Sequence, residues 1–166
     1  MNPQPPTEPG ADDIHRIYDV LVRYANAVDR HDYELLASCF AEDARAEYGG
    51  REIGPGRTAI LDFLKSVRRP LSSMHILGNF HIQVTRNSAM CESALVAYHV
   101  EGSEGKAARI IIRGIRYFDR LEQHEEKWAI IERRHVAEWM TETPALQAAG
   151  FGSGPPAQAP IGEAAT

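Results

Sequence analysis

The segment RRPLSSMHILGNFHIQVT, residues 68–85, contains the change of pattern that sets the fold class. Before Pro70, apolar residues recur at steps of three and four, which is the helical period. After Pro70, apolar and polar residues alternate as they do in strands, and the proline ends the helix that precedes it. Helices are therefore predicted on the N-terminal side of this segment and strands on its C-terminal side.

Three helices are predicted before Pro70. The first begins at Asp12 or Asp13, either of which can cap it, and the others cover residues 33–40 and 57–68. A short strand is expected at 44–48, before the Gly49-Gly50 turn. The apolar stripe of the first helix consists of Ile14, Ile17, Tyr18, Leu21, Tyr24, Ala25 and Val28.

Four long strands are predicted after Pro70, over residues 74–85, 90–100, 109–121 and 128–138. The joins between them are short, so consecutive strands should pair antiparallel. Helices followed by a run of strands indicate an α+β fold, in which a curved antiparallel sheet carries the helices on one face. Such a sheet leaves a cavity at its open end, where ligands usually bind.

The composition excludes several classes of function. The chain has 166 residues, 43% hydrophobic and 25% charged, with a net charge of -5. A negative chain without a basic run does not favour nucleic acid, and no apolar run is long enough for a membrane span. Residues 11–140 are expected to form one domain, with a disordered arm at 1–10 and a flexible tail at 141–166.

The two cysteines and the N-terminus indicate the compartment. Cys39 and Cys91 each fall in an apolar run, which predicts buried thiols rather than a disulfide. The N-terminus has neither the basic start nor the apolar stretch of a secretory signal. These features predict a cytoplasmic protein. No spacing of His or Cys residues indicates a metal site.

Asp29 stands where the first helix should end. The C-terminus of a helix carries partial negative charge, so a carboxylate there is unfavourable. Asp32 can serve as the N-cap of the next helix, but Asp29 has no such local role. Asp29 is therefore either a solvated charge at the helix end or the partner of another side chain.

His75 is the candidate general base, because an imidazole takes up and releases protons near neutral pH. The alternative is a histidine bonded to a backbone carbonyl at a strand edge. Strict alternation puts Ile76, Phe80 and Ile82 on one face and His75 on the other. Either that second face lines a polar cavity, or Gly78 marks a bulge that changes the register.

Further candidates follow from alternation in the last strand. Arg133, His135 and Trp139 share a face and are expected to form one wall of the cavity, although the register between Arg133 and Arg134 can slip by one. Asn79 either orients a ligand carbonyl or binds backbone. His15, His31, His99 and His124 are read as surface residues.

Four segments together resemble the nuclear-transport-factor-2-like superfamily, in its polyketide-cyclase-like (SnoaL-like) branch. They are RYANAVDRHDYELLASCFAEDARAEY, SSMHILGNFHIQV, GIRYFDRLE and KWAIIERR, and they span residues 12–139. The resemblance implies a cone-shaped α+β barrel that encloses a pocket. Within the branch, the chain is most similar to lyases of the scytalone dehydratase, bile-acid 7α-dehydratase and hexachlorocyclohexane dehydrochlorinase types.

The resemblance also implies roles for individual residues. In these lyases an Asp at the end of the first helix orients a His general base, and Asp29 and His75 match that pair. Tyr24 and Tyr48 match pocket tyrosines, although Tyr24 also fits the apolar stripe as a core residue. Arg133 matches an arginine that assists departure of the leaving group.

The implied function is a dehydratase that needs no cofactor and acts on a small hydrophobic, hydroxylated carbonyl or cyclic molecule. One alternative is an isomerase or cyclase of the ketosteroid-isomerase or polyketide-cyclase type. Another is a non-catalytic ligand-binding protein or the small subunit of a ring-hydroxylating oxygenase. Self-association into a trimer or dimer is expected, because strands such as Ile110-Ile111-Ile112 carry more apolar surface than the helices can cover.

Overall fold

The computed structural model describes residues 11–67, 69–102 and 108–144 of the chain. Its elements, in order, are α1 (Ala11–Arg30), α2 (Tyr33–Ser38), β1 (Phe40–Tyr48), β2 (Arg51–Ile53), α3 (Arg57–Ser66), β3 (Ser72–Thr85), β4 (Ser88–Glu101), β5 (Arg109–His124) and β6 (Lys127–Pro144). The predicted arm at 1–10 lies outside the described residues, as does the tail from 145 onward. Residues 141–144 of the predicted tail belong to β6 instead.

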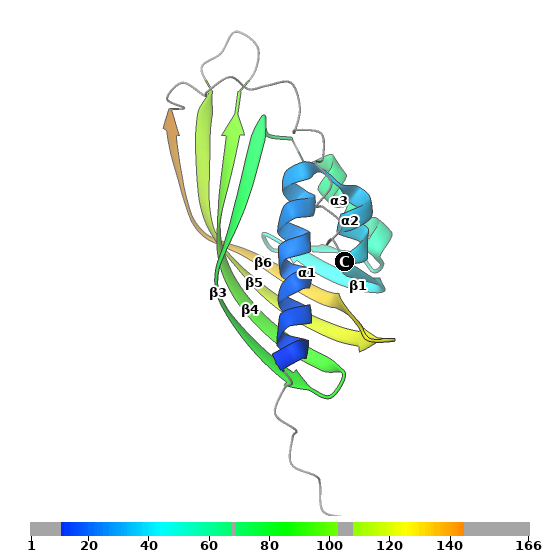
Figure 1. The fold of residues 1–166 in the computed structure, drawn as a ribbon. Helices are drawn as coiled ribbons and strands as arrows, with labels where there is room; N and C mark the ends of the chain where they lie inside the picture. Colours follow the sequence, from blue (N-terminus) through cyan, green and yellow to red (C-terminus); the bar gives the residue numbers. More distant parts are fainter. Residues whose placement is uncertain (1–10, 68, 103–107, 145–166) are drawn as a thin grey trace, which may run out of the picture.

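The six strands form one curved, unclosed sheet in the order β2-β1-β6-β5-β4-β3. Consecutive strands from β3 to β6 pair antiparallel, as predicted. The sheet also contains one parallel pair, β1 with β6, which joins the early hairpin to the last strand. All three helices lie on the concave side of the sheet (Figure 1). The predicted α+β fold is thus confirmed.

Helix α1 crosses the concave face of the sheet and supplies one side of the core (Figure 1). Its buried residues recur at steps of three and four, as the predicted stripe requires. Within that stripe Ile17, Leu21 and Tyr24 are at most 2% exposed. Val20 and Ala27, one position away from the stripe, are equally buried because the sheet curls around the helix.

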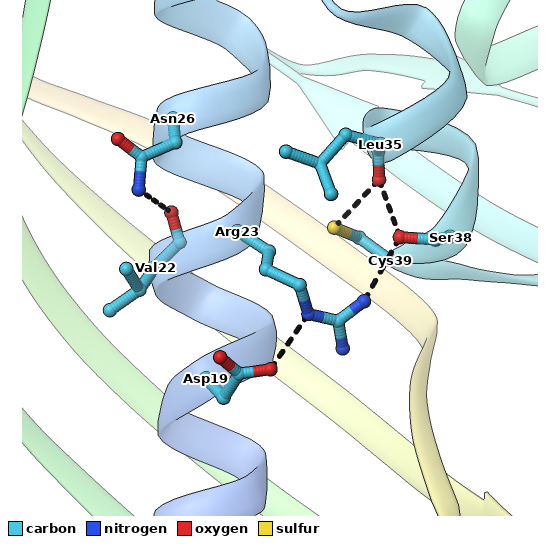
Figure 2. A network of polar contacts seen from close by, with 7 residues as sticks. All are labelled: Asp19, Val22, Arg23, Asn26, Leu35, Ser38 and Cys39. Carbon is cyan, nitrogen blue, oxygen red and sulfur yellow. Dashed lines mark hydrogen bonds and ion pairs between the residues drawn. The ribbon is translucent and has the colours of Figure 1, made fainter. Parts of the chain in front are cut away.

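A polar network joins the middle of α1 to the end of α2 (Figure 2). Arg23 donates from Nε to Asp19, one turn earlier, at 2.8 Å and from Nη1 to Ser38 Oγ at 2.9 Å. Ser38 in turn donates to the carbonyl of Leu35 at 2.7 Å. The side chain of Asp32 accepts from the Leu35 amide at 2.9 Å, as the predicted N-cap of α2. These bonds fix the corner that follows Asp29.

The predicted boundary between α2 and the next strand is displaced. The helix ends at Ser38 and β1 already begins at Phe40, four residues before the predicted strand. The cause is tertiary, since the amide of Ile130 in β6 donates to the carbonyl of Cys39 at 2.8 Å. Cys39 and Cys91 are buried and free, as predicted.

Strand β3 contains the bulge that the sequence left open. Leu77 pairs with Leu95 but Phe80 pairs with Ser93, so β3 holds one residue more than β4 at Gly78-Asn79. The extra residue exchanges the two faces of the strand. His75 and Leu77 therefore face inward before the bulge. Phe80, Ile82 and Val84 face inward after it.

This bulge corrects one expected position. Simple alternation put Ile76 on the same face as Ile82, but Ile76 lies before the bulge and is 50% exposed.

A second bulge lies in β6. Ile115 pairs with Ala137 but Gly114 pairs with Trp139, so Glu138 is the extra residue. Alternation had placed Trp139 on the inward face with Arg133. Beyond the bulge Trp139 faces outward instead, where it is 52% exposed and its indole ring lies over Gly114.

The predicted exposure of residues 110–112 is wrong, because Ile111 is only 5% exposed and its two neighbours are half-buried. The large apolar side chains that are exposed are Val67, Leu71, Met74, Ile76, Phe80, Met90, Trp139 and Met140. None of the helices in the described residues is both long and apolar enough to cross a membrane.

Candidate active site

A cavity of about 450 Å³ lies between the ends of the helices and the inner face of the sheet. Its volume suits a small organic ligand. The lining residues are Ala27, Val28, His31, Tyr33, Leu36, Tyr48, Phe63, Leu64, Val67, Arg69, Pro70, Ser73, His75, His99, Glu101, Arg113, Ile115 and His135. A larger hollow of about 680 Å³ lies along β1, β2 and the neighbouring parts of β5 and β6, and it contains neither Asp29 nor His75.

The structure brings Asp29 and His75 together at the cavity wall. Asp29 Oδ1 lies 2.6 Å from His75 Nδ1, and Oδ2 accepts from the His75 backbone amide at 2.8 Å. Ser73 Oγ also donates to Oδ1, at 2.9 Å. The end of α1 and the start of β3 thus hold the carboxylate and the imidazole through three contacts.

These contacts decide the charge of Asp29. Burial alone would raise its pKa, but the hydrogen bonds from His75 and Ser73 outweigh burial and the pKa falls below its ordinary value. Ionised Asp29 accepts the Nδ1–H proton of His75 and so fixes that tautomer. The Nε2 atom keeps its lone pair and has no partner among the described residues. The His75 side chain is 6% exposed, in the cavity wall.

Tyr48 lines the cavity, whereas Tyr24 lies behind it. Their hydroxyl groups are 2.9 Å apart and share a hydrogen bond. Tyr24 is 2% exposed and packs edge-on against the rings of Phe40 and Tyr117. Burial, with the neighbouring Tyr24, raises the pKa of Tyr48 well above its ordinary value, so Tyr48 remains a hydrogen-bond donor.

Arg133 does not reach the cavity that holds His75. Its guanidinium donates from Nε and Nη2 to the two oxygens of Asp119, at 2.7 and 2.6 Å, and both side chains are fully buried. The rings of Tyr24 and Tyr117 lie 3.9 and 4.1 Å from its central carbon. The register is the predicted one, since Arg134 faces outward over Phe118. Arg133 therefore forms a buried ion pair outside the lining of this cavity, and its contact with a ligand stays a prediction.

Of the remaining predicted residues, only His135 lines the cavity. Its Nδ1 atom is buried and has no hydrogen-bond partner. Burial, together with nearby cationic groups, lowers the pKa of His135. Asn79 and Trp139 are exposed and lie outside the cavity, because the bulges in β3 and β6 direct them elsewhere.

His99 lines the cavity, so its reading as a surface residue is wrong. Arg113, which the sequence did not single out for the site, lines the cavity too. Arg113 Nη1 bonds to His99 Nδ1, and the rings of His75 and His99 are 5.4 Å apart. Arginine can only donate, so Nδ1 of His99 accepts and its proton lies on Nε2. Burial, with the nearby His75 and Arg113, lowers the pKa of His99 to about 4, so the ring is neutral.

A signal for His99 and Arg113 exists in the sequence. His99 continues the buried alternation of Leu95 and Ala97 in β4, and Arg113 does the same for Ile115 in β5. His31 also lines the cavity rather than the outer surface. It follows the last turn of α1, and its own positive φ of 56° redirects the chain there. Within the described ranges no group of three His, Cys, Asp or Glu side chains is placed to hold a metal ion.

The chain belongs to the SnoaL-like domain family, whose model matches residues 10–134. This confirms the resemblance found in the sequence. No functionally curated protein sequence matches the chain.

Several solved structures share the fold. A candidate scytalone dehydratase from Novosphingobium aromaticivorans is 21% identical, with a TM-score of 0.69 over 89% of this chain and 95% of the other. A type 2 hexachlorocyclohexane dehydrochlorinase is 18% identical, with a TM-score of 0.72 over 86% and 96%. A protein of unknown function from Mycobacterium tuberculosis is 27% identical, with a TM-score of 0.66 over 76% and 72%. At the identities of the two lyases the likeness shows the fold.

Proposed function

We propose that the protein is a cofactor-independent lyase, a dehydratase in which His75 is the general base and Asp29 its positioning partner. The observation that carries this proposal is the 2.6 Å contact between His75 Nδ1 and Asp29 in the wall of a cavity. A carboxylate on one ring nitrogen and a free lone pair on the other is the arrangement that proton abstraction needs. The lyases among the structural neighbours support the reaction class.

The proposed reaction removes water from a β-hydroxy carbonyl compound. His75 Nε2 takes the proton from the carbon beside the carbonyl, and Asp29 stabilises the imidazolium that forms. The electron pair of the broken C–H bond forms the double bond as the C–O bond to the hydroxyl breaks. The imidazolium then returns its proton to the departing oxygen, which leaves as water, and His75 is restored.

Tyr48 is the proposed donor to the substrate carbonyl oxygen, where negative charge develops. It keeps its proton because burial raises its pKa. Tyr24 and Tyr48 share one hydrogen bond, and in the proposed mechanism Tyr24 is its donor, so that the Tyr48 proton is free for the substrate. Arg133 and Asp119 act on Tyr24 and Tyr48 only indirectly. Arg133 packs against the rings of Tyr24 and Tyr117 and so holds them in place.

His75→Ala tests the proposal, with hydroxylated cyclic ketones as the substrate panel and loss of one water in the product mass as the readout. Removal of the base should lower kcat by about 10²- to 10⁴-fold. His81→Ala is the matched control, because His81 lies on the same strand but is exposed and outside the cavity. Near-wild-type turnover of His75→Ala would remove the base from the mechanism. A product of unchanged mass would assign the protein to the isomerases instead.

We also infer that copies of the chain associate through the convex face of the sheet. Ile76, Val96, Gly114 and Trp139 form one row across β3, β4, β5 and β6 on that face. Ile76 and Trp139 are 50% and 52% exposed. The helices of the described residues lie on the other, concave side of the sheet (Figure 1). A contiguous apolar surface of this kind usually marks an interface.

A further inference from the structure

Arg113 differs from the other arginines of β5 in what it binds. Arg109, Arg116 and Arg120 each form ion pairs with carboxylates on neighbouring strands, at 3.0, 2.6 and 3.0 Å. No carboxylate in the described part of the chain lies within ion-pair distance of Arg113. Its one described partner is the neutral ring of His99, through Nη1. The Nε and Nη2 donors of Arg113 are left without described partners in the wall of the cavity.

The carboxylates near the cavity bond to groups other than Arg113. Asp29 is engaged by His75 and Ser73, and Glu101 is engaged by Arg109 at 3.0 Å. Arg69, at another part of the cavity wall, donates to the hydroxyl of Tyr33 at 3.3 Å and has no described carboxylate partner either. The cavity therefore carries two arginines that have no carboxylate within ion-pair distance among the described residues.

Burial and nearby cationic groups lower the pKa values of three histidines of the cavity. Burial, followed by the charges of His75 and Arg113, lowers the pKa of His99. Burial and the charge of Arg69 lower the pKa of His31, and burial and cations including Arg113 lower that of His135. All three rings are thus held neutral, so they do not add charge but can donate one N–H each.

We propose that the ligand of this cavity is an amphiphilic monocarboxylic acid, whose carboxylate binds the free edge of Arg113 and whose hydrocarbon part lies against the apolar wall. That wall consists of Val28, Leu36, Phe63, Leu64 and Ile115. The inference rests on the proposed function only in that the ligand is taken to be the substrate. The inference adds an anionic group to the proposed substrate. Bound to Arg113, this group lies near His99, and the reacting carbon lies near His75.

Two features favour a carboxylate over a more highly charged phosphate. One guanidinium fork matches the two oxygens of a planar carboxylate, and the bond is charge-assisted on both sides. The last turn of α1, at Ala27 and Val28, also lines the cavity. The partial negative charge at this helix end opposes a dianion more strongly than a monoanion.

Isothermal titration calorimetry on the full chain tests this assignment with matched pairs of acid and amide. The probes are 2-naphthoate, trans-cinnamate and 4-phenylbutyrate, each compared with its own carboxamide. At least one acid should bind about tenfold or more tightly than its amide, as a charge-assisted bond predicts. Arg113→Met should abolish this preference and leave amide affinity unchanged.

Arg116→Met is the matched control, because Arg116 lies on the same strand but pairs with Glu92 and Glu138 outside the cavity. This variant should keep the preference for the acid. If Arg113→Met does not fold, Arg113→Lys decides, since it keeps the charge but loses the fork and should lose part of the preference.

The assignment is overturned if no acid binds more tightly than its amide, or if the preference survives unchanged in the Arg113 variants. Tighter binding of 2-naphthyl phosphate than of 2-naphthoate would also overturn the choice of a carboxylate. His75→Gln separates this inference from the proposed function. It should keep the acid preference whether or not it turns over substrate, so a failure of binding and a failure of chemistry are distinct results.

Discussion

Asp29 is the residue in which local and tertiary energetics disagree. Its position at the C-terminal end of α1 costs about 0.3–1 kcal/mol of interaction with the helix dipole. Hydrogen bonds to a charged group contribute about 1.5–3 kcal/mol each, and Asp29 accepts from Ser73, from the His75 amide and from the His75 ring. The tertiary contacts therefore outweigh the local cost, and the unfavourable position in the sequence marks the site.

His99 should make the stability of the protein depend on pH. The pKa of His99 is about 4 in the folded protein and 6.5 ordinarily. Between pH 4 and pH 6.5 the unfolded chain therefore binds a proton at His99 that the folded protein does not bind. The free energy of unfolding should therefore fall as the pH falls from about 6.5 to about 4. The cause is burial beside the cationic Arg113, which disfavours a second charge.

Urea denaturation at several pH values measures this effect, with His99→Gln as the comparison. His31 and His135 shift in the same direction and remain in both proteins, so the difference between them isolates His99. The variant should lose less stability than the wild type over this range. Parallel curves for the two proteins would contradict the assignment.

At the scale of elements, the site depends on one extra residue in β3. The bulge at Gly78-Asn79 lets His75 and Ile82 face the same side although seven positions separate them. A regular strand can place only one of the two inward, because its faces alternate strictly. Strand β3 lies at the edge of the sheet and pairs only with β4. The bulge therefore disturbs the hydrogen bonds to one neighbouring strand and not to two.

Deletion of Asn79 should remove the bulge and force a choice between the site and the core. Either His75 leaves the cavity, or Ile82 and Val84 turn to solvent. Both are partly buried, so each should cost less than the roughly 1.5–3 kcal/mol of a fully buried side chain. Activity and urea denaturation together measure the outcome. Asn79→Ala is the control and should resemble the wild type in both, because this side chain is exposed. A fully active, fully stable deletion variant would refute the role of the bulge.

The ion pair between β5 and β6 provides a second test at this scale. Arg133→Met leaves the carboxylate of Asp119 buried without its partner and should cost about 3–5 kcal/mol of unfolding free energy. The double variant Arg133→Met with Asp119→Leu removes both charges and should recover most of that loss. Chemical denaturation of the wild type, Arg133→Met and the double variant measures the loss and its recovery. An Arg133→Met variant that is stable but inactive would instead restore a direct role for Arg133 with the substrate.

For the whole molecule, the curvature of the sheet separates two surfaces with different uses. The concave face holds the helices, the core and the cavity (Figure 1). The convex face carries the apolar row from Ile76 to Trp139 and is the proposed surface of self-association. The candidate site and the proposed interface therefore lie on opposite faces of the same strands.

Trp139→Lys tests the proposed interface. A lysine at this end of the apolar row would be buried in the contact without a partner, so the variant should shift toward the monomer. Sedimentation velocity at several concentrations measures the change against the wild type. Glu122→Lys is a suitable control, since Glu122 lies on β5 far from the row and its ion pairs are with Arg120 and His124. An unchanged oligomeric state in Trp139→Lys would place the interface elsewhere.

Much of the fold follows from local pattern. The change at Pro70, the stripe of α1 and the four strands of the second half all lie close to where the periodicity predicted them. Within the site, Asp29 stood out by its poor fit to the helix end and His75 by its chemistry. The family resemblance joined these two residues before any distance was known.

The sequence by itself thus determined the order of the elements, because helix and strand periods are local properties. It also supplied His75 and Asp29 as the candidates for the proposed base and its partner, through residue type and family resemblance. The tertiary structure alone decided which side chains face the cavity. The bulge in β3 lets His75 face the cavity, and the bulge in β6 turns Trp139 away from it. Arg133 pairs with Asp119 in the core and does not line the cavity. One extra residue in a bulge reverses which side chains of a strand face inward. A buried charge is stable only beside its ion-pair partner. Neither effect can be read from local sequence.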